Sequence, residues 1–302
     1  MKYDKDPLTF DEQAELLLRR GMRGDKGLIV RRLQSVSFFR LSGYWYTFRQ
    51  DNKTDPHSPL SEFKPGTTFE AVWERYAFDR RLRLLMMDAV ERIEIVVRSL
   101  LATHHAMRHG LFSYAETPAA LPSRDSFVDK CGEEQRRSKD AFVRHFVRKY
   151  SDRHAFLPIW MAAEIMSFGT LLTLHRGSHQ SIRREIAAPF EVHATVFASW
   201  LLMLNTIRNI CAHHGRLWNR ELGTRPQIPE RLPDWQTPIA ITGNRVFVAL
   251  TICRWCLARI APQSGWHERL HALLRSSPTI PLNSMGFPES WESSPIWTGS
   301  HA

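Results

Sequence analysis

The residues best suited to acid–base and phosphate chemistry lie together in RNICAHHGRLWNR, residues 208–220. Arg208, Asn209 and His213 place a guanidinium, an amide and an imidazole close together in the chain. A histidine can take up or release a proton near neutral pH, and an arginine can hold a phosphate through two parallel hydrogen bonds. Together these groups suit cleavage of a phosphodiester, in which histidine moves protons and arginine stabilises the added charge.

The apolar pattern before this motif predicts a helix over about residues 193–214. The residues of its buried stripe recur at helical spacing: Val196, Trp200, Met203, Leu204, Ile207 and Cys211. At about 100° per residue, Asn209 and His213 fall together on the opposite face, and Arg208 lies on the flank. His214 falls on the apolar stripe, and we therefore expect it to pack inward.

Pairs of arginine and histidine separated by four to six residues are weak evidence by themselves. With 33 arginines and 14 histidines in 302 residues, about five such pairs are expected by chance. Five occur, at three places: Arg98 with His104 and His105, Arg148 with His154, and Arg208 with His213 and His214. A helix C-terminus also favours cations without any catalysis. The residues alone therefore leave two interpretations open, a solvated helix end and a nuclease site.

Longer blocks of sequence carry more information than this spacing. Four of them follow one another along the chain: FFRLSGYWYTFR (38–49), FDRRLRLLMMDAVERIEIVVRS (78–99), PIWMAAEIMSFGTL (158–171) and RNICAHHGRLWNR (208–220). In sequence and order they resemble the Abi-like abortive-infection proteins of bacteria. The resemblance implies the HEPN superfamily, whose members are helical, usually dimeric and generally metal-independent ribonucleases. Some of its members act in phage defence or in toxin–antitoxin pairs.

Carried over to this chain, the resemblance implies that Arg208 and His213 are the catalytic pair and that Asn209 is the polar residue following the arginine. The expected reaction is attack of a 2′-hydroxyl on the neighbouring phosphate. His214 and the Glu94–Arg98 pair are expected to support the site.

The expected assembly is a homodimer. Leu202 faces the same side of the predicted helix as His213, which is consistent with a second subunit covering that face.

The residues that follow the motif suit RNA binding. Arg216, Asn219 and Arg220 are expected to hold RNA, whereas Trp218 is expected in the core. The net charge of +10 and the excess of arginine over lysine fit a polyanionic partner, although a GC-rich genome also enriches arginine. The expected partners are an RNA substrate and a regulatory non-coding RNA, and no cofactor is expected.

The chain is expected to be all-α, a HEPN-type helical bundle with an N-terminal helical extension and a partly irregular C-terminal tail. Capping boxes at Thr9–Glu12 and Thr67–Glu70 predict two helix starts. The second helix is predicted to run to about His105 with an apolar stripe of Phe78, Leu82, Leu85, Ala89, Ile93, Val96 and Leu100. Another single helix is predicted over 157–177. The expected division is an N-terminal helical region (1–66), a HEPN-like domain (67–275) and an extended or disordered tail (276–302).

The composition favours a cytoplasmic protein. No apolar run approaches the roughly twenty residues that span a bilayer, and the N-terminal segment is polar. The four cysteines are too scattered for a disulfide framework. Cys253 and Cys256 lie in an apolar helical pattern and are expected to be core thiols.

Two other functions remain open at this point. A metal-dependent enzyme could use His104, His105 and His109, but the chain has no HExxH motif and no second cysteine pair. Alternatively, a basic helical protein of the same fold could bind RNA as a non-catalytic sensor or regulator.

Overall fold

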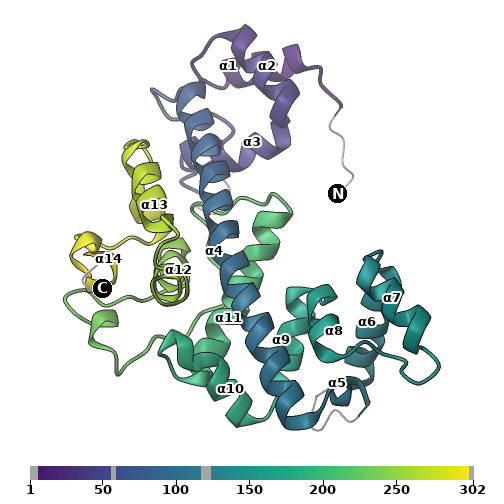
Figure 1. The fold of residues 1–302 in the computed structure, drawn as a ribbon. Helices are drawn as coiled ribbons and strands as arrows, with labels where there is room; N and C mark the ends of the chain where they lie inside the picture. The colour runs from purple at the N-terminus through teal and green to yellow at the C-terminus, as the bar shows by residue number, and fades with distance from the viewer. Residues whose placement is uncertain (1–5, 56–58, 117–123, 299–302) are drawn as a thin grey trace. The chain divides into compact units, whose positions relative to one another are not determined.

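A computed structural model describes residues 6–55, 59–116 and 124–298 of the chain (Figure 1). Within these ranges the secondary structure is helical, and the β-type contacts are two isolated bridges, Arg23–Thr68 and Arg49–Phe63. The expected all-α fold class is confirmed. None of the described helices is by itself long and apolar enough to cross a bilayer. The segments Gln180–Phe190 (α10 and η2) and Ala194–Ala212 (α11) reach that length and composition together, but they meet at 75°.

The chain forms two compact units, and the boundary differs from the expected one at residue 66. The first unit comprises the chain up to Leu82 together with His271–Pro281, and the second comprises Arg83–Leu270 and the chain from Leu282 onward. The division falls inside one long helix. Its first turns belong to the N-terminal unit, because the Tyr44 hydroxyl donates to the buried Asp79 carboxylate at 2.6 Å and the Tyr44 ring lies edge-on to Tyr76.

The N-terminal unit is built from short helices around the start of that long helix. Its elements are α1 (Phe10–Arg19), α2 (Lys26–Val36), α3 (Phe38–Trp45), η1 (Tyr46–Phe48) and the first part of α4 (Phe69–His109). The capping box predicted at Thr9 and Glu12 is confirmed, with hydrogen bonds in both directions. The second predicted box is wrong by one residue: the Thr68 hydroxyl accepts from Ala71 N, whereas Thr67 is buried and donates to Lys64 O.

The second unit holds the rest of α4 and the later helices. They are α5 (Ser113–Glu116), α6 (Arg124–Arg137), α7 (Ala141–Tyr150), α8 (Ile159–Ile165), α9 (Phe168–Gly177), α10 (Gln180–Ala187), η2 (Ala188–Phe190), α11 (Ala194–Ala212), η3 (Pro233–Trp235), α12 (Val246–Ile260), η4 (Leu282–Met285), η5 (Trp291–Ser293) and α14 (Pro295–Thr298). Helix α13 (Trp266–Arg275) crosses the boundary.

Helix α11 packs against α9, α10 and α12. Three buried indole rings continue this core, with Trp235 5.0 Å from Trp200 and 5.6 Å from Trp255.

The long helix α4 buries a different stripe from the predicted one in its second half. Phe78, Leu82, Ala89 and Ile93 are buried as predicted. Leu85, Val96 and Leu100 are half-buried, and the fully buried positions are Met86, Val90, Val97 and Leu101. Over such a length the true helical period turns the buried face away from a strict alternation of three and four.

The helix predicted over 157–177 is divided in two. Helix α8 ends at Ile165, Met166 is extended, and Ser167 caps α9 by accepting from Thr170 N. The break is stabilised from outside, because the Arg98 guanidinium donates to the Met166 carbonyl at 3.0 Å. The Glu134 carboxylate also accepts from Ser167 N and from the Thr170 hydroxyl.

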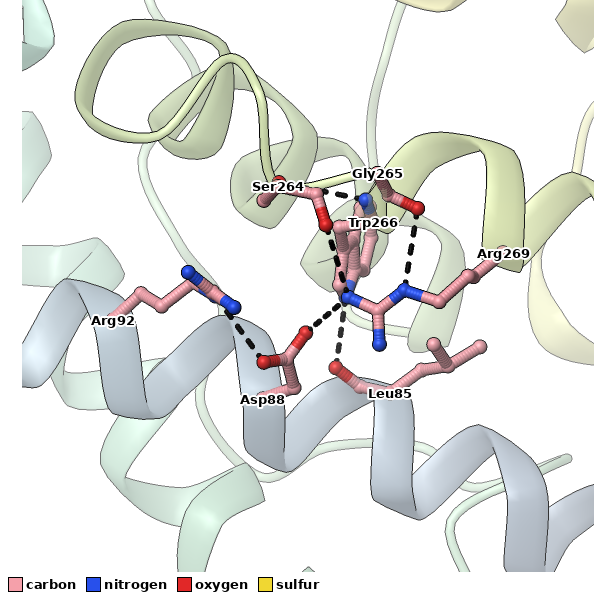
Figure 2. A network of polar contacts seen from close by, with 7 residues as sticks. All are labelled: Leu85, Asp88, Arg92, Ser264, Gly265, Trp266 and Arg269. Carbon is pink, nitrogen blue, oxygen red and sulfur yellow. Dashed lines mark hydrogen bonds and ion pairs between the residues drawn. The ribbon is translucent and has the colours of Figure 1, made fainter.

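A polar network holds the start of α13 to α4 within the second unit (Figure 2). The Trp266 indole donates to Leu85 O at 2.8 Å. Asp88 accepts from Arg269 at 2.6 Å through one carboxylate oxygen and from Arg92 at 3.2 Å through the other. Trp266 is 1% exposed, so its ring is core while its N–H reaches a helix carbonyl.

The tail, expected to be extended or disordered, is ordered over its described part, which ends at Thr298. It forms η4, η5 and α14, and it buries Met285, Trp291, Ile296 and Trp297. The Trp297 ring stacks on Phe247 of α12 at 5.9 Å, and its indole donates to the Thr251 hydroxyl. Two tryptophans and a phenylalanine supply enough apolar surface to order a segment that is rich in proline and serine. Residues 299–302 of the expected tail lie outside the described ranges.

Candidate functional site

The motif lies at the C-terminal end of α11, and the backbone there forms a Schellman cap. The helix ends at Ala212, His213 is the C-cap residue, and His214 takes the left-handed conformation with φ 57°. His214 N donates to Cys211 O at 3.0 Å, and Gly215 N donates to Ile210 O at 2.7 Å. These are the two hydrogen bonds of a Schellman cap. They set the direction in which the two histidines leave the helix.

Arg208, Asn209 and His213 are presented toward solvent. Asn209 and His213 are exposed and Arg208 is half-buried. Their side chains make no hydrogen bond or ion pair with any residue of the described ranges. Asn209 and His213 are four residues apart and therefore lie on one side of the helix end, as predicted. The three groups are thus available to a ligand.

The prediction for His214 is wrong. Its side chain is exposed, not packed on the apolar stripe. The helical projection fails because the helix ends two residues earlier and His214 turns into the left-handed region. The rest of the stripe is confirmed by buried Trp200, Met203, Leu204, Ile207 and Cys211, with Val196 half-buried.

Gly215 allows the chain to turn closely against the end of α11. A Cβ at this position would lie 3.2 Å from both Ile210 Cγ2 and Ile210 O. The Arg220 guanidinium also lies near this turn: Nη1 would be 3.6 Å from a Cβ on Gly215, and it donates to Arg216 O at 3.3 Å. Arg220 is exposed and Arg216 is half-buried, so both guanidiniums lie just beyond His213 and His214 in the chain.

Asn219 has a structural role. It takes the left-handed conformation with φ 45°, and its side-chain oxygen accepts from Arg245 at 3.3 Å. Arg245 also donates to Ser284 O, which connects this turn to the ordered tail. Trp218 is 1% exposed, which confirms its predicted place in the core.

The segment after the motif returns along α11. The Thr224 hydroxyl lies 3.4 Å from the Thr206 hydroxyl, Gln227 N donates to the Ser199 hydroxyl at 2.8 Å, and Gln227 O accepts from the Trp200 indole. This return segment therefore covers part of the face that Leu202 shares with His213. Leu202 itself is 39% exposed.

The Glu94–Arg98 pair supports the α8–α9 break. Arg98 donates to Glu94 at 2.6 Å and to Met166 O at 3.0 Å, and both side chains are largely buried. Among the described residues, no hydrogen bond or ion pair joins this pair to Arg208 or His213. Helix α9 in turn approaches α11 one turn before the motif, where a Cβ on Gly169 would lie 4.0 Å from the Asn205 amide. Asn205 is four residues before Asn209 and therefore lies near it on the same side of α11.

The other histidine clusters are occupied by local contacts. His104 pairs with Glu185 at 3.1 Å, His105 contacts the Ser113 hydroxyl at 3.1 Å, and His154 stacks on Phe112 at 4.1 Å. Burial and then the charge of His109 lower the pKa of His105 to about 4. The described ranges contain no group of three or more His, Cys, Asp or Glu side chains arranged to hold a metal ion.

The cysteine prediction is confirmed. Cys253 and Cys256 are fully buried in α12 and carry free thiols. Burial raises the pKa of both thiols well above the ordinary range, so they belong to the core.

Comparison with known proteins identifies the chain at the level of a family. No curated protein and no solved structure matches it. The model of one family, described as Abi-like protein, matches residues 31–219, which is well over half of the chain. This span contains three of the four blocks of sequence completely and the fourth, which carries Arg208, Asn209 and His213, except for its last residue. The chain belongs to the Abi-like protein family.

Proposed function

We propose that this protein is a metal-independent endoribonuclease of the HEPN type, acting in the cytoplasm in abortive infection of phage-infected cells or as the toxin of a toxin–antitoxin pair. One observation carries the proposal. Arg208, Asn209 and His213 leave the end of α11 toward solvent without protein partners among the described residues. They do so inside the span matched by the Abi-like family.

The proposed reaction needs proton transfer and charge stabilisation. His213 accepts the proton of a 2′-hydroxyl as its oxygen forms a bond to the adjacent phosphorus, and the bond from phosphorus to the 5′ oxygen breaks. A proton goes to that leaving oxygen, and the products are a 2′,3′-cyclic phosphate and a 5′-hydroxyl. Arg208 stabilises the charge on the phosphate oxygens, and Asn209 orients the phosphate or the imidazole.

A homodimer would complete the acid–base chemistry. One histidine can serve as the base while a second, protonated histidine serves as the acid, and each positioned group contributes about 10²–10⁴-fold. Two copies of the motif facing each other would supply both. Arg216 and Arg220 are proposed to contact the phosphates of the RNA on either side.

The test is cleavage of RNA by purified protein in EDTA, for wild type and for Arg208→Ala and His213→Ala. Matched controls are Arg144→Ala and His145→Ala, which remove the same two residue types from the exposed face of α7. Each variant should be folded by circular dichroism. We expect wild type and both controls to cut, with cyclic phosphate ends, and each motif variant to lose at least about 100-fold in rate.

Two results would contradict the proposal. If EDTA abolishes cutting and a divalent ion restores it, the metal-independent mechanism is wrong. If wild type binds RNA and none of the proteins cuts it, the chain is a non-catalytic RNA-binding regulator.

A further inference from the structure

The block FFRLSGYWYTFR forms α3 and η1, and it divides its aromatic side chains between two faces. Tyr44 and Trp45 face the core and are 1% exposed. Phe39 is 88% exposed, and Tyr46 is 46% exposed. Phe39 lies in the first turn of α3, and Tyr46 follows the last residue of α3 and begins η1. The seven-residue spacing is close to two helical turns, so the two rings project toward a similar side. Gly43 lies between them and contributes no side chain.

Cations surround this outward face. Residues 38–49 include Arg40 and Arg49 and no acidic residue. The Arg49 guanidinium lies 6.0 Å from the centre of the Tyr46 ring, and the Arg75 guanidinium lies over Phe48 at 3.7 Å. Arg75 also donates to the Thr47 hydroxyl. Arg49 therefore lies beside the Tyr46 ring of this face, and Arg75 lies over the neighbouring Phe48 ring.

Arg49 has no acidic partner within the described ranges. Burial and then the charge of Arg49 lower the pKa of the nearby Arg20 guanidinium, and the charge of Glu62 opposes this decrease. Arg49 itself, with no carboxylate paired to it among the described residues, is available to an anion.

The chain accepts backbone strain where this face begins. Ser37 ends α2 and caps α3 with φ 70° and ψ 146°, a conformation that an L-residue other than glycine rarely adopts. This turn starts α3 at Phe38 and leaves Phe39 in its first turn, in solvent. Because the Phe39 ring buries little of its surface within the chain, that apolar surface is available to a ligand.

We propose that the face made by Phe39, Tyr46, Arg40 and Arg49, here called the aromatic–arginine face, binds single-stranded RNA. Unpaired bases stack on the two rings, and the guanidiniums hold the phosphates between them. Sequence-tolerant binding of single strands commonly combines stacking on aromatic rings with a positively charged surface. A duplex keeps its bases stacked inside and cannot use the rings in this way. The inference rests on the proposed function in taking RNA as the ligand, and it specifies unpaired RNA.

The test measures binding without cleavage. A fluorescent 12-nucleotide RNA with 2′-O-methyl groups cannot be cut by 2′-hydroxyl attack, so fluorescence anisotropy with the full chain reports binding alone. We expect Phe39→Ala and Phe39→Leu to weaken binding at least about fivefold, the lower end for loss of one base–aromatic stack, and Phe39→Trp to retain it. Trp160→Ala is the matched control, because it removes another exposed aromatic ring, from α8. Arg49→Gln should reduce the slope of the logarithm of the binding constant against the logarithm of the salt concentration by about one, the contribution of one phosphate contact.

Each other outcome overturns the inference. Unchanged binding by Phe39→Ala, or equal binding of the same sequence as a duplex, excludes the aromatic–arginine face as a single-strand site, whatever the cleavage assay shows. If Phe39→Leu binds RNA normally while Phe39→Ala changes the sedimentation coefficient, the face binds a second copy of the chain. Absence of RNA binding by any form also rejects the inference, and the cleavage assay then decides the proposed function separately.

Discussion

At the scale of single residues, the geometry of the motif depends on the backbone of two neighbours, His214 and Gly215. His214 adopts the left-handed conformation that ends α11, and Gly215 lies against the Ile210 carbonyl. Helices often place a glycine in that left-handed position, but here the glycine is one residue later and serves close approach. The exit direction of His213 therefore depends on the whole His–His–Gly turn.

Gly215→Ala is expected to disturb this turn. Its new Cβ would lie 3.2 Å from Ile210 O, and that oxygen cannot move away without losing its hydrogen bond from Gly215 N. We expect a loss of about 1–3 kcal/mol in the free energy of unfolding together with slower RNA cleavage. The control is Gly223→Ala, because nothing lies within 4 Å of a Cβ there. Equal stability of the two variants in urea would show that the turn tolerates the methyl group.

At the scale of elements, the break between α8 and α9 is where helix propensity and tertiary contacts disagree. The stretch of apolar residues would allow one helix, yet Met166 is extended and its carbonyl accepts from Arg98. Glu94 holds that arginine in place, and both side chains are largely buried. The pair is thus structural, and it stabilises the turn from which α9 reaches α11.

Arg98→Ala is expected to destabilise the protein by about 2 kcal/mol, because it leaves the Glu94 carboxylate and the Met166 carbonyl without their charged donor. Removing both partners in Glu94→Gln/Arg98→Met should be less harmful than removing the arginine alone. The exposed Glu133–Arg137 pair on α6 has the same spacing and is the control, and Arg137→Ala there should change stability by less than about 1 kcal/mol. Urea denaturation of these proteins and of the single variants Glu94→Gln and Arg98→Met gives the comparison. If the losses of the two single variants add up to the loss of the double variant, the two residues are not a coupled pair.

At the scale of the whole molecule, two buried histidines make stability depend on pH. Burial is the main cause that lowers the pKa of His105 and of His175 to about 4. An unfolded histidine titrates near 6.5, so between about pH 6.5 and pH 4 the unfolded chain binds more protons. Stability is therefore greatest above about pH 6.5 and falls as the pH drops toward 4.

The melting temperature should accordingly decrease between about pH 7 and pH 4.5, with a contribution of order 1–3 kcal/mol from each histidine. His175→Leu should reduce this decrease, since the buried group can no longer be protonated on unfolding. His145→Leu replaces an exposed histidine on α7 and should leave the decrease unchanged. If the melting temperatures of wild type and His175→Leu decrease equally with pH, His175 does not contribute to the pH dependence of stability.

Much of the helical organisation followed from local sequence. The first capping box, the course of α4 and the apolar stripe of α11 were predicted, because side-chain periodicity and caps act within one or two turns. The positions of Arg208, Asn209 and His213 at a helix end also followed from that periodicity. The family resemblance rests on four blocks of sequence in a fixed order. Neither composition nor the spacing of arginine and histidine would have identified the family.

The tertiary structure decided what depends on contacts between distant residues. The α8–α9 break needs Arg98 from α4, the exposure of His214 depends on where α11 ends, and the order of the tail depends on Trp297 packing against α12. Likewise, the 38–49 block is simply aromatic in sequence, and it is the fold that turns Tyr44 and Trp45 inward and Phe39 and Tyr46 outward. Propensity and periodicity describe one element at a time. The partner of a carbonyl at a helix break and the exposure of an aromatic ring depend on what the rest of the chain places beside them.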